Sequence, residues 1–263
     1  MKHSKLIFLD YSGTLCFDAV RFGESERLAA ALASSGLAAL GLKEVDFFWE
    51  KVVNPTWTEG STTKIGYAAL LERRLGELLE APEEELRQAV RRFTDSYFAS
   101  FRIDRRWEET LRRLRDRTDI SLVIATDHYA EATGLIIDSL AAVGIKGGPL
   151  GDVRAEPGLI MVANSADLGY AKADRRFWDV LRSSFPDFRS GSVILVDDFG
   201  CNEAGGSDYS AWPKVILRCE KTETLLADVF QAPLRVVTFF ERAPESSGQF
   251  RSLEEVVREL EGL

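Results

Sequence analysis

Short runs of consecutive apolar residues mark the strands that we expect from this sequence. The two clearest runs cover residues 6–9 and 120–125, and neither alternates with polar residues. Such a run is typical of a strand buried on both faces, as in a parallel sheet. Shorter apolar runs predict further strands at residues 159–162, 192–196, 215–217 and 235–240.

Between residues 18 and 117 the apolar positions follow a helical period, and no convincing strand is found. Pro82 and the three glutamates after it favour a helix N-terminus. The apolar stripe of that helix is Leu86, Val90, Phe93, Tyr97 and Phe101. Pro, Gly and Ser in residues 54–61 predict a loop, with Ser61 as the N-cap of a helix over residues 62–79. Later helices are expected after His128, over residues 171–182 and over residues 252–260, with a loop over residues 147–158.

Strands alternate with helices at the start of the chain and again after residue 120, and helices fill the hundred residues between. This layout predicts an α/β protein with a parallel sheet and an all-helical insertion. We expect residues 1–17 and 105–263 to form the core domain and residues 18–104 to form the insertion. Because the insertion follows the first strand, it is well placed to cover the edge of the sheet where that strand ends.

Composition narrows the possible functions of the 263-residue chain. Its formal net charge is -9, which argues against a nucleic-acid partner because phosphate contacts need a basic surface. The three cysteines form neither a disulfide framework nor a zinc pattern, so we expect a reducing, cytoplasmic setting. No stretch approaches the roughly 20 apolar residues of a membrane span, and the first apolar run is too short for a signal peptide.

Polar residues end the predicted strands. In a parallel sheet the carboxyl ends of the strands present the chemistry at one edge. The residues at these ends are Asp10, Ser12, Thr126, Asp127, Asp197 and Asp198, and Lys172 lies ahead of a predicted helix. Each has an ordinary structural explanation by itself: a cap, a solvated turn or a surface lysine. Together they suit the attack of a carboxylate on a phosphoryl group.

Attack of one anion on another is opposed by charge repulsion. A divalent cation held by Asp10 and Asp198 would screen that repulsion. Oxygen ligands without a histidine or cysteine cluster point to Mg²⁺. Thr126 could donate a hydrogen bond to a phosphoryl oxygen, and Lys172 could neutralise further charge.

The order of these groups resembles the haloacid dehalogenase-like (HAD) hydrolase superfamily, whose first motif is an apolar strand followed by Asp-x-Asp-Gly-Thr. Here residues 9–15 read Leu-Asp-Tyr-Ser-Gly-Thr-Leu. The second motif is a strand ending in Ser or Thr, here Thr126. The third is a lysine in a Gly-Tyr-x-Lys run, here residues 169–172, without the family's two prolines. The fourth is an apolar strand with acids, here residues 196–203. The resemblance covers residues 1–17 and about 105–218.

The resemblance implies a Rossmann-like parallel sheet with an inserted C1-type helical cap. It also implies a Mg²⁺-dependent phosphatase acting on a small phosphorylated metabolite. Asp10 would be the nucleophile that forms an aspartyl-phosphate, and Thr126 and Lys172 would hold the transferring group. Asp198 would bind the metal together with Asp10 and the backbone carbonyl of Ser12. Asp197 and Glu203 would be further ligands or would support them.

Ser12 departs from the family pattern. The phosphatases carry a second Asp there, which serves as general acid and then base, and a serine hydroxyl is no base near pH 7. General acid-base catalysis contributes roughly 10²- to 10⁴-fold. A slow phosphatase, a phosphonate hydrolase, a haloacid dehalogenase and a binding or regulatory protein therefore stay open. A phosphonate hydrolase would need a Schiff-base lysine in the cap, for which Lys43, Lys51 and Lys64 are the choices.

Three other residues are candidates for substrate contact. His128 could replace the missing acid/base, or it could be a solvent-facing histidine at a helix start. Trp57 could stack on substrate, or it could pack between cap helices, and Lys64 could meet an anion. Without a base, the aspartyl-phosphate on Asp10 should accumulate unless His128 or a substrate group activates the water.

Overall fold

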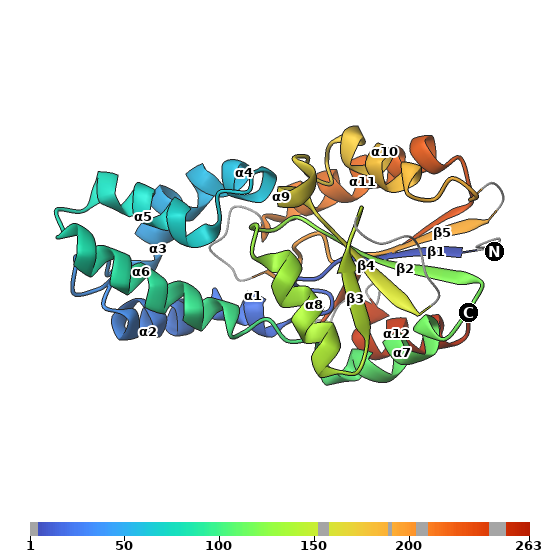
Figure 1. Ribbon diagram of the computed structural model, residues 1–263, viewed down its shortest axis with the longest axis horizontal. Coiled ribbons are helices and arrows are strands. Elements are labelled where there is room, and N and C mark those ends of the chain that lie inside the picture. Colours follow the sequence, from blue (N-terminus) through green and yellow to red (C-terminus); the bar gives the residue numbers. More distant parts are fainter. Residues whose placement is uncertain (1–4, 152–157, 189–190, 204–209, 242–250) are drawn as a thin grey trace.

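Six parallel strands form one sheet in the order β3-β4-β2-β1-β5-β6 (Figure 1). The computed structural model describes residues 5–151, 158–188, 191–203, 210–241 and 251–263. The strands are β1 (Lys5–Leu9), β2 (Ile120–Thr126), β3 (Lys146–Pro149), β4 (Leu159–Asn164), β5 (Ser192–Val196) and β6 (Leu234–Val237). The predicted parallel α/β core is confirmed, and β1 lies at its centre between β2 and β5.

Alternate residues of each strand face two helical layers, which explains the unbroken apolar runs. Ile7 and Leu9 pack into one cluster, whereas Leu6 and Phe8 pack into the other. The first layer is α7 (Arg105–Arg115), α8 (Ala132–Ala142) and α12 (Leu253–Glu261), and the second is α9 (Ser165–Leu168), α10 (Arg175–Ser183) and α11 (Trp212–Phe230). A short pair, β7 (Phe239–Phe240) and β8 (Arg251–Ser252), adjoins α12.

Residues 18–104, all of them described, contain helices and no strand, as predicted. The helices are α1 (Asp18–Phe22), α2 (Ser25–Ser35), α3 (Val45–Phe47), the π-helical segment η1 (Phe48–Val53), α4 (Asn54–Thr62), α5 (Tyr67–Leu78) and α6 (Glu83–Phe98). They enclose a hydrophobic cluster of their own, to which the sheet part contributes Tyr129. Figure 1 shows this helical lobe extending from the end of the sheet.

The predicted loop over residues 54–61 is wrong, because these residues form α4. Pro55 occupies the first turn, where its missing N–H and fixed φ suit a helix. The Thr56 hydroxyl donates to the Val52 carbonyl at 2.6 Å, so the chain continues directly from η1. Ser61 is therefore inside α4, and the next helix begins only at Tyr67.

Two further element predictions near the sheet are also wrong. Residues 215–217 belong to α11, which Pro213 opens; Ile216 and Leu217 are exposed there and only Val215 is buried. An apolar run of three cannot distinguish a strand from a helix. Within the predicted loop over 147–158, residues up to Pro149 pair with β4 as strand β3, and this glycine-rich strand packs against α8. Residues 152–157 lie outside the described part of the chain.

The helical lobe is attached to the sheet part at the start of α5. The Glu131 carboxylate, just ahead of α8, accepts the Tyr67 backbone N–H at 2.8 and 3.0 Å. The Tyr67 ring stacks on that of Tyr129 with 4.1 Å between centroids. An acid that accepts the first N–H of a helix caps it and interacts favourably with its dipole. Glu131 therefore fixes α5 against the sheet part.

Glu131→Ala is expected to lower the free energy of unfolding by about 1 kcal/mol, the usual effect of losing an N-terminal cap. Urea denaturation followed by circular dichroism measures the change. Asp138→Ala removes an exposed acid from the neighbouring α8 and should change stability by less than about 0.5 kcal/mol. Equal effects of the two substitutions would contradict the anchoring role of Glu131.

Candidate functional site

The turn after β1 brings the ends of β1 and β5 together. Gly13 has φ +76°, a backbone conformation that favours glycine. A Cβ atom there would lie 2.5 Å from the Asp198 Oδ2 atom. The Asp198 backbone N–H donates to the Thr14 hydroxyl at 3.2 Å, and the Asn202 side-chain amide donates to the Gly13 carbonyl at 2.8 Å. The Gly-Thr pair of the first motif thus allows the acid after β5 to lie against the turn.

Lys172 joins two of the buried carboxylates. Its Nζ atom lies 2.6 Å from Asp10 Oδ1 and 2.7 Å from Asp197 Oδ2. Its backbone is held as well, because its N–H donates to Asp127 at 2.8 Å and its carbonyl accepts the Trp178 indole N–H at 2.7 Å. Lys172 lies just before α10, and it is buried rather than on the surface. Asp127, predicted to contact substrate, thus also positions Lys172.

Asp10, Asp197 and Asp198 form a cluster whose nearest carboxylate oxygens lie within 4.8 Å of one another. All three residues are buried. Asp198 accepts the Asn202 backbone N–H at 2.9 Å, and Asp197 accepts that of Phe199 at 2.7 Å. Glu203 is not part of this cluster. Three acids are thus gathered around one lysine.

Burial and the excess of negative charge change the pKa values of these acids. Burial raises the pKa of Asp10 to about 7, although Lys172 acts in the opposite direction. Burial, reinforced by Asp10 and Asp197, raises the pKa of Asp198 well above its ordinary value. Buried charges need compensation, and oxygen ligands suit Mg²⁺. The donor set therefore fits a divalent cation held by Asp10 and Asp198, with the Ser12 carbonyl in the same turn.

This charge cluster predicts a pH dependence of stability when divalent cations are chelated. The pKa of Asp10 is about 3.8 in the unfolded chain and about 7 in the folded protein, so the folded state binds more protons between these values. Stability should fall as pH rises through this window, by about 1.4 kcal/mol per pH unit for each acid that titrates. Urea titrations from pH 4 to pH 8 in chelator measure the slope.

Asp10→Asn should reduce that slope by about 1.4 kcal/mol per pH unit, because an amide does not titrate while the other buried acids still do. The matched control is Asp138→Asn, which changes an exposed acid of α8 and should leave the slope unchanged. A wild-type stability that rises steadily from pH 4 to pH 8 in chelator would contradict the uncompensated cluster.

His128 is buried and neutral. Its Nδ1 atom accepts the Tyr129 backbone N–H at 2.8 Å, so its proton is on Nε2, which lies 3.2 Å from the Tyr97 hydroxyl. Burial lowers the pKa of His128 to about 3. With one nitrogen occupied as an acceptor and the other protonated, the ring has no free lone pair to take a proton from water. Neither the predicted role as a base nor the solvent-facing alternative fits this placement.

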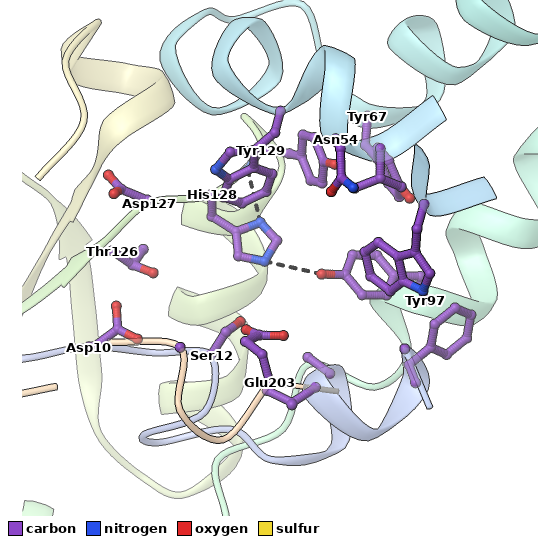
Figure 2. Close-up of a pocket in the computed structure, with 18 of the residues that line it drawn as sticks. Asp10, Ser12, Asn54, Tyr67, Tyr97, Thr126, Asp127, His128, Tyr129 and Glu203 are labelled. Carbon is purple, nitrogen blue, oxygen red and sulfur yellow. Dashed lines mark hydrogen bonds between the residues drawn. The ribbon is translucent and has the colours of Figure 1, made fainter. Parts of the chain in front are cut away.

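A cavity of about 250 Å³ connects the acids with the helical lobe. The residues that line this cavity include most of the predicted site residues. They are Asp10, Ser12, Thr126, Asp127, His128, Lys172, Asp197, Asp198, Trp57 and Glu203. In Figure 2 the side chains of Ser12 and Glu203 point toward each other. Burial raises the pKa of Glu203 to about 7, with Arg218 acting in the opposite direction. The structure thus brings together every predicted site residue except Lys64.

The helical lobe places its own predicted residues differently. Trp57 lies on α4, half-buried and edge-on to the Tyr129 ring at 5.3 Å between centroids, so it both packs and lines the cavity. Lys64 is exposed and does not line it, because α4 extends to Thr62 where a loop was predicted. Lys43 and Lys51 are also exposed and outside the cavity lining. No lysine of residues 18–104 is placed for a Schiff base with a substrate in this cavity.

Sequence reasoning missed several lining residues. The sequence predicts Tyr97 only as part of the apolar stripe of α6. In the structure its hydroxyl lies 3.2 Å from His128 Nε2, and the residue lines the cavity. The sequence predicts a loop at Asn54 and a strand over the residues just before Arg218. Arg218 binds the Phe199 carbonyl through Nη2 at 2.6 Å. No motif marks these residues, because helix packing alone brings them to the site.

Structural comparison identifies the architecture. A 2-haloacid dehalogenase from Pseudomonas syringae pv. tomato DC3000 is similar, with a TM-score of 0.52, 17% identity and coverage of 99% of this chain and 98% of that chain. The structure of the "putative HAD-hydrolase YfnB" from Bacillus subtilis, bound to magnesium, matches with a TM-score of 0.52, 15% identity and 99% coverage of both chains. The chain has the HAD-like fold.

A predicted HAD-like family hydrolase from Porphyromonas gingivalis matches this HAD-like fold as well, with a TM-score of 0.51, 12% identity and 98% coverage of both chains. No protein-family model and no curated protein matches the sequence. Among the helices that the structure describes, none is both long and apolar enough to cross a membrane. The likeness extends over the whole chain, so the helical lobe is part of it as well as the sheet.

Proposed function

We propose that the protein is a Mg²⁺-dependent phosphoryl-transfer hydrolase that acts as a phosphatase on a small phosphorylated compound. The observation that carries the proposal is the buried cluster of Asp10, Asp197 and Asp198 around Lys172. A structural salt bridge would need one acid for one lysine, whereas this site gathers three. Residues 18–104 are proposed to act as the cap that closes the site.

The reaction has two displacements at phosphorus. The Asp10 carboxylate attacks, the bond from phosphorus to the leaving oxygen breaks, and an alcohol and an aspartyl-phosphate result. Water then attacks the aspartyl-phosphate, which releases inorganic phosphate and restores Asp10. Lys172 and the Thr126 hydroxyl stabilise the charge of the transferring group. Mg²⁺, bound by Asp10, Asp198 and the Ser12 carbonyl, would screen the repulsion between nucleophile and phosphate.

The water of the second step needs a base, which Ser12 and His128 do not supply. Two lining carboxylates lie outside the three-acid cluster. Asp127 accepts the Lys172 backbone N–H, whereas Glu203 points toward Ser12. We assign it the proton transfer that the second Asp of the first motif performs in the family's phosphatases. It would give a proton to the leaving oxygen and take one from the attacking water.

Stopped-flow kinetics with an aryl phosphate tests this assignment, because an aryl leaving group needs little acid in the first step. Glu203→Gln should produce a burst followed by turnover slowed by about 100-fold, the lower end of general-base effects. Asp10→Asn should abolish both phases. The control Glu220→Gln changes an exposed acid on α11 and should behave as wild type.

The double variant Ser12→Asp, Glu203→Gln should regain most of the lost turnover, since it places a carboxylate where the family has one. If Glu203→Gln turns over like wild type, another group supplies the base. If wild type and the Ser12→Asp variant are both inert toward good leaving groups while Mg²⁺ still binds, the protein has a binding or regulatory role instead.

Isothermal calorimetry tests the metal assignment. Asp198→Asn should weaken Mg²⁺ binding by at least about 10-fold, because the site loses a charged oxygen ligand. Glu220→Gln again serves as the control. Unchanged Mg²⁺ affinity in Asp198→Asn would contradict the proposed ligand set.

The two other hydrolytic alternatives fit the site less well. A haloacid dehalogenase displaces halide from carbon without a divalent cation, which leaves the third buried acid, Asp198, without a purpose. A phosphonate hydrolase of this superfamily needs a cap lysine at the site, and Lys43, Lys51 and Lys64 are all exposed outside the cavity lining.

A further inference from the structure

The sheet part and the helical lobe line the cavity with different kinds of side chain. The sheet part lines it with acids and with Lys172, Lys214 and Arg218, whereas the helical lobe lines it with apolar and aromatic side chains. Every residue from 18 to 104 is described, and none of those that line the cavity carries a charge. Asn54 is the one lining residue of this lobe with an amide side chain. In Figure 2 it lies with Tyr67 and Tyr97 across the cavity from Asp10 and Ser12.

Several aromatic rings of this wall are only half-buried, so part of each surface faces the cavity. They are Phe22, Trp49, Trp57 and Tyr97, from α1, η1, α4 and α6. Deeper rings hold them in place: Phe22 packs edge-on to Phe93 at 5.6 Å between centroids. A ligand group placed there would be desolvated and would find few hydrogen-bond partners, which disfavours a polyol or a carboxylate.

The size of the cavity limits the ligand. An apolar cavity of about 150 Å³ holds one benzene ring. The 250 Å³ found here is enough for one such ring and a phosphoryl group.

We propose that the substrate is a phosphate monoester whose alcohol is uncharged, apolar and carries a single ring or a group of similar size. This rests on the proposed phosphatase activity and adds its substrate class. The phosphoryl group binds among Asp10, Thr126 and Lys172, and the apolar group binds against Trp49 and Trp57. Asn54 can hydrogen-bond with one polar atom of the leaving group.

A cationic leaving group is the competing class, because aromatic rings also attract quaternary ammonium ions. The lobe offers no carboxylate to such a cation. Of the lining acids outside the three-acid cluster, Glu203 is opposed by the charge of Arg218, and Asp127 accepts the Lys172 backbone N–H. An apolar wall with no anion favours the neutral group, since a cation would lose its hydration without gaining a partner.

For uncharged primary alkyl phosphates, steady-state kinetics separates binding from leaving-group reactivity, because their alcohols have similar acidity. Choline is a more acidic alcohol, so its ester is also compared by its affinity for the inactive Asp10→Asn variant. The kcat/KM of wild type for 2-phenylethyl phosphate should exceed that for ethyl phosphate by about 10- to 100-fold, the effect of burying one ring. The kcat/KM for glycerol 3-phosphate should not exceed that for ethyl phosphate. The kcat/KM for 3,3-dimethylbutyl phosphate should exceed that for its cationic counterpart, choline phosphate.

Variants then locate the effect. Trp49→Gln should lower kcat/KM for 2-phenylethyl phosphate about 10-fold more than that for ethyl phosphate, whereas Trp49→Phe should retain the preference. Phe47→Ala is the matched control, because Phe47 is exposed two residues away and does not line the cavity. Circular dichroism and thermal melting confirm that each variant is folded.

The outcomes separate the two proposals. Equal kcat/KM for 2-phenylethyl and glycerol phosphates overturns the substrate class and leaves the phosphatase activity standing. Tighter binding of choline phosphate than of 3,3-dimethylbutyl phosphate to the inactive Asp10→Asn variant overturns it in favour of a cationic group. If none of the esters is hydrolysed while Mg²⁺ binds, the phosphatase activity itself fails, and the substrate class with it.

Discussion

The contact of Lys172 with Asp10 and Asp197 is the interaction on which the site depends. Burying acids is unfavourable unless their charge is compensated, and removing one partner of a buried ion pair typically costs about 3 to 5 kcal/mol. Lys172 is held at 2.6 and 2.7 Å from the two acids, and its backbone is fixed by Asp127 and Trp178. Among the residues that the structure describes, no lysine or arginine forms an ion pair with Asp198, which leaves charge that a divalent cation would balance.

The central sheet makes this arrangement possible. β1 is flanked by β2 and β5, so Asp10 and Asp197 directly follow two neighbouring parallel strands and Thr126 is the last residue of a third. The sequence was sufficient to predict this part, because strands buried on both faces leave unbroken apolar runs and their polar successors are conspicuous. Gly13, at positive φ, allows Asp198 to pack against the first turn.

For the helical lobe the sequence predicted helices, but it did not predict which of their side chains line the cavity. Its helical period was visible, but the loop over residues 54–61 proved to be α4, which brings Trp57 to the cavity and leaves Lys64 in solvent. The roles of Tyr97 and Asn54 could not be read, since packing between distant helices decides which residues of an amphipathic helix face a cavity. The same holds for the hydrogen bonds that fix His128 as a neutral ring.

Covalent trapping tests the central claim most directly, namely that the acids around Lys172 support phosphoryl transfer to Asp10. The Glu203→Gln variant is mixed with an aryl phosphate and Mg²⁺, quenched in acid and analysed by peptide mass spectrometry. We predict one phosphoryl group on the peptide that contains Asp10, lost on treatment with base and absent from Asp10→Asn. A phosphoryl group on another residue, or phosphate release at wild-type rate from Asp10→Asn, would contradict the account.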